Sequence, residues 1–291
     1  MTTELVIISG KGGTGKTSLT ASLAVLAEKA VIADCDVDAA DLHLVLSPVV
    51  RERREFRSGR EAIIISEKCS GCGVCRDLCR FEAVGLVVGP AGREVMAVDP
   101  FSCEGCGVCV RFCPEEAIAF PERLCGEWMI SSTRCGPMVH ARLGVAAENS
   151  GKLVSTVRRE ARRIAEEGRH PLILVDGPPG VGCPVIASVT GATKVLAVTE
   201  PTVSGEHDLE RVLALTRHFG VPTLVCVNKW DINPDMAERI EVKAREAGAT
   251  IAGRIRYDRE VTAAQIRKQA VVETDCPAAG DILALWRNLE L

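Results

Sequence analysis

Hydrophobic residues in this chain alternate between short continuous runs and longer stretches in which they recur every three or four positions. Five short apolar runs predict buried strands, at 5–8, 31–33, 171–176, 195–198 and 223–227. Five stretches with helical spacing predict helices, at 18–29, 153–165, 206–219, 234–247 and 278–289. Because strands that alternate with helices form parallel sheets covered by helices, we predict an α/β fold with a mostly parallel, doubly wound sheet.

A glycine-rich segment, I-S-G-K-G-G-T-G-K-T, connects the first predicted strand to the first predicted helix. It fits the phosphate-loop pattern G-x-x-x-x-G-K-[ST], whose backbone N–H groups converge on phosphate oxygens at a helix N-terminus. We expect Lys16 to reach the β- and γ-phosphates and the Thr17 hydroxyl to bind Mg²⁺. The predicted nucleotide-binding residues of this segment are Gly10, Lys11, Gly12, Gly13, Thr14, Gly15, Lys16, Thr17 and Ser18.

Acidic residues follow two of the predicted strands, at the edge where open α/β sheets bind ligands. Asp36 comes after the strand at 31–33, with Asp38 as a weaker candidate and helix capping as an alternative role. Asp176 ends the strand at 171–176 and precedes G-P-P-G, so we expect it to hold the Mg²⁺ shell while Gly180 senses the γ-phosphate.

Eight of the fourteen cysteines form two runs with the spacing Cys-x2-Cys-x2-Cys-x3-Cys. Bacterial ferredoxins bind [4Fe-4S] clusters with this run, and its fourth cysteine serves the other cluster. One cluster is therefore expected on Cys69, Cys72, Cys75 and Cys113, and the other on Cys103, Cys106, Cys109 and Cys79. Zinc is the less favoured alternative, because zinc sites need four ligands in two pairs and not two tetrads.

The cysteine runs interrupt the nucleotide-binding pattern, because the glycine-rich loop precedes them and Asp176 follows. We predict an ATPase domain of residues 1–62 and 122–291 with an inserted domain at 63–121, a small α+β dicluster ferredoxin. The insert has five basic and eight acidic side chains, which suits a redox partner with a basic face. The arginine-rich segment 51–60 before it is expected to be an exposed connector.

Lys11, the D-C-D at residues 34–36, D-G-P-P-G and T-E-P-T-V-S-G-E-H-D-L-E together resemble the MinD superfamily (SIMIBI, including Mrp and the nitrogenase iron protein), in a form with an inserted 2[4Fe-4S] ferredoxin domain. The resemblance implies a homodimer with ATP at its interface and Lys11 crossing to the partner's nucleotide. It also implies that Asp36 orients the attacking water and contacts Mg²⁺, and that Asn228 reads adenine. A solvated loop lysine is the alternative for Lys11.

Cys183 occupies the position that, in the nitrogenase iron protein which this part of the chain resembles, binds a cluster shared by two subunits. Cys183, with Cys135, is therefore a possible ligand of a third cluster, and a buried inert thiol is the alternative. We expect Arg158, Arg159, Arg162 and Arg163 to be solvated, because they lie off the apolar stripe of their helix. His140 is expected to make a structural polar contact.

Composition limits the partners and the location. The net charge of −4 and the 3% aromatic content argue against nucleic acid as a partner. No apolar run could cross a bilayer, and neither a secretory signal nor a basic amphipathic anchor is evident, so we expect a cytoplasmic protein without a membrane anchor.

The function expected from these features is an Mg-ATP-dependent ATPase whose nucleotide state gates electron transfer through two [4Fe-4S] clusters to a partner protein. The first alternative is an iron-sulfur cluster carrier of the Mrp type with a client protein, although the six other cysteines include no Cys-x-x-Cys pair. The second alternative is a spatial-organisation ATPase of the MinD/ParA kind. The expected cofactors are ATP, Mg²⁺ and the two clusters.

Overall fold

The computed structural model describes residues 2–89, 92–144 and 149–291, and these form two compact units. The first unit contains Met1–Arg54, Glu127–Leu143 and Asn149–Leu291. The second contains Glu55–Gly126 and a short stretch that begins at Gly144. The second unit thus includes the predicted insert 63–121 and extends beyond it on both sides. It is wider because the strands on either side of the insert, at 49–60 and 122–133, extend into this unit.

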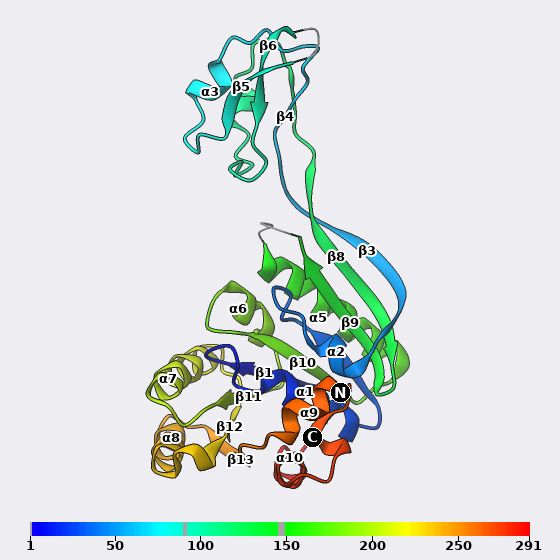
Figure 1. Ribbon diagram of the computed structural model, residues 1–291, viewed down its shortest axis with the longest axis vertical. Coiled ribbons are helices and arrows are strands. Elements are labelled where there is room, and N and C mark those ends of the chain that lie inside the picture. Colours follow the sequence, from blue (N-terminus) through cyan, green and yellow to red (C-terminus); the bar gives the residue numbers. More distant parts are fainter. Residues whose placement is uncertain (1, 90–91, 145–148) are drawn as a thin grey trace. The chain divides into compact units, whose positions relative to one another are not determined.

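A nine-stranded sheet organises the first unit, in the order β13-β12-β11-β1-β10-β2-β9-β8-β3 (Figure 1). All the pairings from β13 to β9 are parallel. The strands are β1 Thr3–Ser9, β2 Ala30–Asp34, β3 Val49–Arg60, β8 Glu122–Thr133, β9 Gly136–Leu143, β10 Leu172–Pro179, β11 Lys194–Thr199, β12 Thr223–Asn228 and β13 Thr250–Ile255. The predicted mostly parallel α/β sheet is confirmed, and β13 is a strand that the hydrophobic pattern did not predict.

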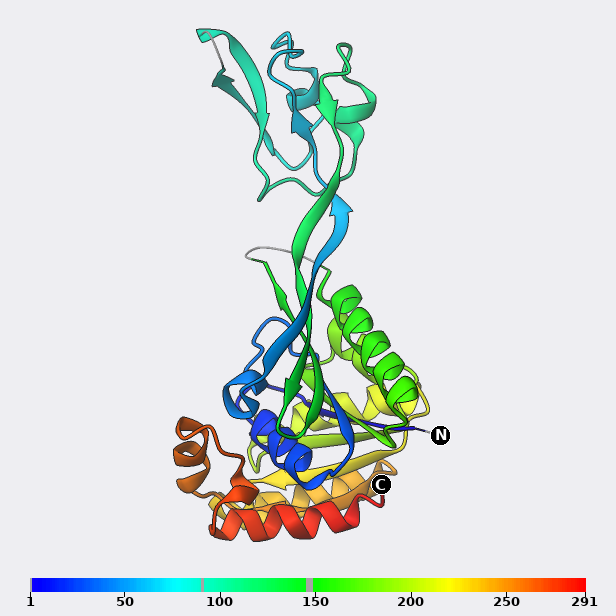
Figure 2. The same ribbon diagram turned by 90° about the vertical axis from the view of Figure 1, so that its right-hand side faces the viewer.

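Helices cover both faces of this sheet. The first face packs against α1 (Lys16–Leu26), α2 (Leu42–Leu46) and α10 (Pro277–Asn288), which share one core with strand residues such as Leu5, Ile7 and Leu174. The intervening strand residues face the opposite way, where α5 (Ser150–Gly168), α6 (Cys183–Val189), α7 (Val203–His218) and α8 (Pro234–Glu246) contact the sheet. Figure 2 shows α10 in red and α5 in green on opposite sides. The short α9 spans Glu260–Ile266, and single 3-10 turns lie at Trp230–Ile232 and Val271–Glu273.

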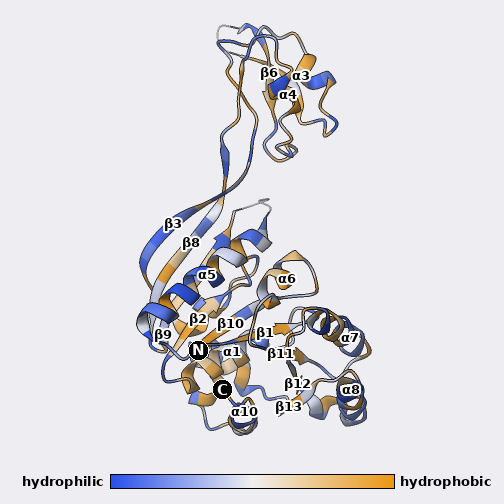
Figure 3. Ribbon diagram, turned by 180° about the vertical axis from the view of Figure 1, so that it is seen from behind, coloured by the Kyte–Doolittle hydropathy of each residue, from blue (hydrophilic) through white to orange (hydrophobic). Residues whose placement is uncertain are grey.

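The arginine-rich segment is mostly exposed and leads the chain from the first unit into the second, as predicted, but it is also a strand. Residues 51–60 belong to β3, the last strand of the sheet, which is hydrophilic along most of its length (Figure 3). Arg53 donates to both carboxylate oxygens of Glu127 on β8, at 3.0 and 2.8 Å, and the Arg54 guanidinium lies 5.2 Å from the ring centroid of Trp128. The prediction missed the strand because charged side chains are common on edge strands, where one row of backbone groups is unpaired.

The second unit is built from two small antiparallel pairs. In the first pair β4 (Ile63–Ile64) lies beside β7 (Ile118–Ala119), and in the second β5 (Val84–Val88) lies beside β6 (Glu94–Val98). Its two short helices, α3 (Val74–Asp77) and α4 (Val108–Arg111), pack together, and each follows a glycine with positive φ. Those glycines, Gly73 and Gly107, occupy equivalent places in the two cysteine runs, so the sequence repeat is also a repeat of backbone conformation.

Two of the arginines predicted to be solvated instead contact the interior of the first unit. Arg158 is 4% exposed and donates to Glu4 Oε1 at 2.7 Å, while Arg162 donates to Glu4 Oε2 at 2.6 Å. Arg158 also donates to the carbonyl oxygens of Ala187 and Thr190, at 2.6 and 2.9 Å. The prediction failed because Glu4, at the start of β1, lies beneath α5, and two guanidinium groups can share one buried carboxylate.

None of the helices within the described ranges is both long and apolar enough to span a membrane.

Candidate functional site: a glycine-rich loop and a cysteine-lined cavity

The glycine-rich loop lies between β1 and α1, as the sequence predicts. Gly13 and Gly15 have φ angles of 79° and 84°, a region that side chains disfavour. A Cβ at Gly15 would also lie 2.3 Å from Asn228 Nδ2. Gly10 has another role, since a Cβ there would lie 2.8 Å from the backbone carbonyl carbon of Asp208 on α7. Gly10 therefore allows close packing against α7, and it is not among the residues that line the cavity described below.

Lys16 lies between the two carboxylates that the sequence predicted. Its Nζ is 3.0 Å from Asp176 Oδ1 and 3.3 Å from Asp36 Oδ2, and its side chain is 6% exposed. It also lies 3.5 Å from Thr17 Oγ1. Burial opposes the charge on Lys16, but Asp176 and Asp36 outweigh this cost and raise the lysine pKa. The start of α1, the strand β10 and the segment after β2 thus bring one cation and two anions together.

Asp34, which the sequence reasoning passed over, adds a third carboxylate. It is fully buried on β2, directly beside Asp176 of β10, and its Oδ1 accepts a hydrogen bond from the Asp36 N–H at 3.2 Å. Burial and then the Asp176 carboxylate raise the pKa of Asp34 well above its usual value. The strand register carried this signal, because the parallel pairing of β2 with β10 places Asp34 directly opposite Asp176.

Two buried carboxylate oxygens at this edge, Asp34 Oδ2 and Asp176 Oδ2, have no hydrogen-bond partner among the residues that the structure describes. The other Asp176 oxygen, Oδ1, accepts from Thr20 Oγ1 at 3.0 Å as well as from Lys16. Unpaired buried carboxylate oxygens are costly, and hard oxygen donors of this kind suit Mg²⁺ or a water bound to it. The donor set therefore fits a magnesium ion.

The end of β12 holds the loop from one side. Asn228 Nδ2 donates to the Thr14 carbonyl oxygen at 2.8 Å, and Asn228 Oδ1 accepts from the Lys229 N–H at 3.0 Å. Lys229 Nζ donates to the Gly13 carbonyl oxygen at 3.3 Å. An amide has two N–H donors and two lone pairs, so one of each remains on Asn228 for another partner. Adenine recognition by Asn228 stays a prediction, while its contact with the loop is an additional role.

Lys11 contacts its own chain. Its Nζ lies 3.2 Å from Ser204 Oγ, 3.4 Å from Thr202 Oγ1 and 3.4 Å from Glu200 Oε2. Gly180 follows β10 with a φ of 92°, and its N–H donates to the Ser9 carbonyl oxygen at 2.8 Å. Roles in a second subunit for Lys11, and as a γ-phosphate sensor for Gly180, remain predictions.

A cavity of about 780 Å³ opens beside this loop. Its lining includes Gly12, Gly13, Thr14, Gly15, Lys16, Thr17, Ser18, Asp36, Asn228 and Lys229. The opposite wall comes from the segment around α9, with Arg256, Tyr257, Val261 and Gln265. Gln265 Nε2 donates to Ser18 Oγ at 2.7 Å and so connects that wall to α1. The cavity has the size of a small-ligand site, and most of the predicted nucleotide-binding residues line it.

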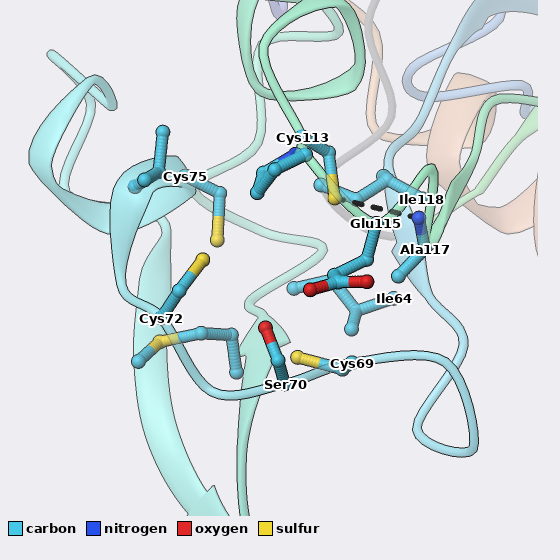
Figure 4. Close-up of a pocket in the computed structure, with 12 residues that line it drawn as sticks. Ile64, Cys69, Ser70, Cys72, Cys75, Cys113, Glu115, Ala117 and Ile118 are labelled. Atoms are coloured by element: carbon cyan, nitrogen blue, oxygen red, sulfur yellow. Dashed lines mark hydrogen bonds between the residues drawn. The ribbon is translucent and has the colours of Figure 1, made fainter.

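A second cavity, in the second unit, is lined by cysteines of both runs. Cys69, Cys72 and Cys75 come from the first run and Cys113 from the second, and their sulfur atoms point toward the same space (Figure 4). The Ala117 N–H donates to Cys113 Sγ at 3.4 Å. The other walls are mainly apolar, from Ile64, Val74, Met96, Pro114, Ala117 and Ile118. Burial raises the pKa of the Cys75 thiol, and the nearby Cys69 and Cys72 raise it further.

The remaining four cysteines of the two runs lie in the same unit. Cys79, Cys103 and Cys109 pack against its small core, and Cys106 is exposed. Burial raises the pKa of Cys109, which has Cys103 and Cys106 as neighbours. Within the described ranges, no three His, Cys, Asp or Glu side chains approach closely enough to hold a single metal ion. A cubane spreads its four cysteine ligands over four iron atoms, so its thiols lie farther apart than those around one ion.

The possible third-cluster ligands occupy different elements. Cys183 is exposed at the first residue of α6, and Cys135, in the turn between β8 and β9, packs against the main core. Cys183 is therefore not the buried thiol of the alternative prediction, and its binding of a cluster remains untested. His140 makes the polar contact expected of it, because its Nε2 lies 2.8 Å from Ser131 Oγ in a buried position.

A parallel sheet, a glycine loop at a helix N-terminus, and a lysine paired with one aspartate on β10 and one just after β2 define a P-loop nucleotide-binding domain. Comparison with known families gives the same class in more detail. Residues 5–271 match the family described as the CobQ/CobB/MinD/ParA nucleotide binding domain, and the chain belongs to that family.

Relatives and solved structures agree with this family. An uncharacterised protein of Methanocaldococcus jannaschii is 36% identical over 233 residues, 79% of each chain. The fold is similar to that of the septum site-determining protein MinD complexed with Mg-ADP from Pyrococcus horikoshii, with a TM-score of 0.61, 17% identity, and coverage of 100% of this chain and 96% of the other. The MinC:MinD cell division protein complex of Aquifex aeolicus gives a TM-score of 0.59 at 21% identity, with 99% and 96% covered.

Proposed function

We propose that this protein is an Mg-ATP-dependent ATPase whose second unit is a dicluster ferredoxin domain, and that its nucleotide state gates electron transfer from that unit to a partner protein. The observation that carries the proposal is the cavity shared by Cys113 of the second run and three cysteines of the first. This is the exchange of fourth ligands that ferredoxin runs use.

In the nucleotide site, we assign the loop N–H groups and Lys16 to the phosphates, and the Thr17 hydroxyl with Asp176 to the Mg²⁺ shell. The fit of Mg²⁺ rests on the unpaired buried Oδ2 atoms of Asp176 and Asp34. When bound, the ion would neutralise charge on the β- and γ-phosphates. We assign Asp36, which is buried and paired with Lys16, to accept a hydrogen bond from an attacking water. When the nucleotide binds, its phosphates give Lys16 a negatively charged partner other than Asp36 and Asp176.

In the cysteine-bearing unit, four thiols and a mainly apolar wall fit a [4Fe-4S] cluster. Cys69, Cys72, Cys75 and Cys113 would hold one cluster, and Cys103, Cys106, Cys109 and Cys79 the other. Such clusters accept and donate single electrons. The chain's own contribution is to bury Cys69 and Cys75, while Cys72 is exposed, and to direct the Ala117 N–H at Cys113 Sγ, a contact that favours the thiolate.

The test uses full-length protein purified without oxygen. We expect about eight iron atoms per chain, and a rate of electron delivery to a co-purified acceptor that changes on addition of Mg-ATP. Lys16→Gln should keep its iron and lose the response to ATP. Iron content near zero would refute the redox assignment, and an unchanged rate in protein that hydrolyses ATP would refute the gating.

A MinD/ParA-like spatial-organisation ATPase is the second candidate. The comparisons favour it over electron transfer, because the structures described above are named for cell division and not for redox chemistry. It leaves the eight cysteines without a role. Imaging of a fluorescent fusion would distinguish the two, since an ATP-dependent, uneven distribution in cells that is unaffected by Cys72→Ser supports this candidate alone.

An iron-sulfur carrier of the Mrp type is the third candidate. It requires cluster release, whereas eight cysteines in two complete runs favour retention. Transfer of labelled iron from this protein to an apo-protein would support the carrier function over electron transfer.

A further inference from the structure

The two cysteine runs are supported by different parts of the second unit. Gly71 and Gly105 are the third residues of their runs, and their φ angles are 74° and 62°. A Cβ on Gly71 would lie 2.8 Å from the backbone oxygen of Glu94, the first residue of β6. A Cβ on Gly105 would lie 2.2 Å from the backbone oxygen of Arg60, the last residue of β3. Each glycine therefore lets its run approach a backbone, and the two backbones belong to different elements.

The fifth residues of the runs show the same difference. Outside its own run, the atom nearest to a Cβ on Gly73 would be Met96 Cε of β6, at 3.8 Å. A Cβ on Gly107 would instead lie 3.2 Å from the ring of Phe120, which precedes β8. Arg60 donates to the Phe120 carbonyl oxygen at 3.2 Å, and its guanidinium carbon lies 5.6 Å from the ring centroid. The first run thus rests on β6, and the second rests on the end of β3 and the segment before β8.

The strand that ends at Arg60 starts beside the nucleotide cavity of the first unit. Leu44 and Val45 of α2 line that cavity, and β3 begins shortly after them, at Val49. Arg134, the residue after β8, donates to the Val45 carbonyl oxygen at 2.8 Å. The strands β3 and β8, which are neighbours in the sheet, are therefore both attached to α2, and both continue into the second unit.

We propose that Arg60 and Phe120 are positioning residues for the second cysteine run, and that through them the nucleotide state changes the reduction potential of one cluster only. That cluster, named here the second cluster, is the one assigned to Cys103, Cys106, Cys109 and Cys79. The proposal rests on the proposed function, because it identifies where ATP acts on the ferredoxin unit. A change at α2 reaches the second run along β3 and β8, and backbone contacts around a cluster set its potential. Among the residues that the structure describes, the glycines of the first run contact β6 instead.

The first test measures backbone amide hydrogen exchange by mass spectrometry in the full-length protein purified without oxygen. Phe120→Leu should raise the exchange rate of residues 103–109 about three- to tenfold, because one partly buried ring contact is lost, and leave residues 69–75 unchanged. Met96→Leu is the matched variant, since Met96 has the corresponding place beside the first run, and it should affect residues 69–75 alone. An effect of Phe120→Leu on both segments, or on neither, would overturn the positioning role.

The second test measures the potential of each cluster by redox titration followed by electron paramagnetic resonance, with and without Mg-ATP. Mg-ATP should shift the potential of the second cluster alone. Gly105→Ala places a Cβ against the Arg60 backbone and should about halve this shift, whereas Gly71→Ala, with the same backbone strain in the first run, should retain it. Phe120→Leu provides the same comparison if Gly105→Ala binds less iron.

The outcomes separate this proposal from the proposed function. A shift of the first cluster, an equal shift of both, or a shift of neither in protein that contains iron and binds ATP would refute the route through Arg60 and Phe120. Iron near zero, or no binding of ATP in calorimetry, would refute the proposed function instead, and hydrogen exchange would still decide whether these two residues position the second run.

Discussion

The two cavities differ in the contacts that their polar groups make within the protein. In the nucleotide cavity Lys16 pairs with Asp36 and Asp176, so the protein supplies both signs of charge. In the cysteine cavity, the described contacts of the thiols include one hydrogen bond, from the Ala117 N–H to Cys113 Sγ, and the walls are mainly apolar. The first site is therefore organised by the chain itself. In the proposed function a cluster holds the four cysteines of the second site together, so the two units should respond to different perturbations.

The largest effect should come from removing the cation of the first site. Lys16→Gln is expected to lower the ATP hydrolysis rate about a thousandfold, because the charge that stabilises the transferring phosphoryl group is lost. Steady-state phosphate release measures this, and the iron content should not change. Lys152→Gln, on the surface of α5, is the control. Full activity in Lys16→Gln would contradict the role of this lysine.

Removal of the buried guanidinium of Arg158 should destabilise the first unit alone. Arg158→Ala leaves Glu4 with only the partly exposed Arg162, and we expect a loss of about 3–5 kcal/mol in the free energy of unfolding. Calorimetry of the iron-loaded protein should show the unfolding transition of the first unit at a lower temperature. The iron absorbance, which reports on the second unit, should be lost at the same temperature as in the unsubstituted protein. Arg159→Ala, whose side chain is 69% exposed, should change stability by less than about 0.5 kcal/mol. Equal effects of the two substitutions would show that the buried pair is unimportant.

Lowering the pH should destabilise the first unit through protonation of His140. Burial, with smaller contributions from the charges of His43, Arg142 and Arg53, lowers the pKa of this histidine to about 4. A histidine with a depressed folded-state pKa contributes full stability above its unfolded value of about 6.5, and the contribution is lost as the pH falls from there toward 4. The loss amounts to about 3 kcal/mol. The free energy of unfolding, measured by chemical denaturation between pH 7 and 4, should depend less on pH in His140→Gln than in the unsubstituted protein. The same pH dependence in both proteins would refute this role of His140.

The smallest change in free energy is expected from substitutions that test which cysteines hold the same cluster. They are also the sharpest test of the second cavity. Cys113→Ser and Cys69→Ser should each remove about half of the iron and alter the same spectral component, while Cys79→Ser and Cys103→Ser alter the other. ATP binding should persist in all four. Cys125→Ser is the control, because this buried thiol donates to the Ser58 carbonyl oxygen outside both runs. Grouping of Cys113 with Cys103 would show that each run holds its own cluster.

Local sequence patterns predicted much of this protein. The spacing of G-x-x-x-x-G-K-T between a strand and a helix located the loop because phosphate binding needs glycine backbone freedom and a helix N-terminus in immediate succession. Continuous apolar runs located the inner strands because parallel strands are covered on both faces. Edge strands have no such requirement, which is why the pattern of charged residues at 51–60 did not predict the strand β3.

Tertiary structure decided the features that depend on residues far apart in the chain. Only the register of β2 against β10 places Asp34 beside Asp176, and only the packing of α5 over β1 buries Arg158 against Glu4. Likewise, Lys11 contacts Glu200, which lies far from it in sequence. Sequence alone determined which chemical groups are present and which local conformations they favour. Long-range pairing determined which charges meet, because the energy of a buried charge depends on its neighbours in space.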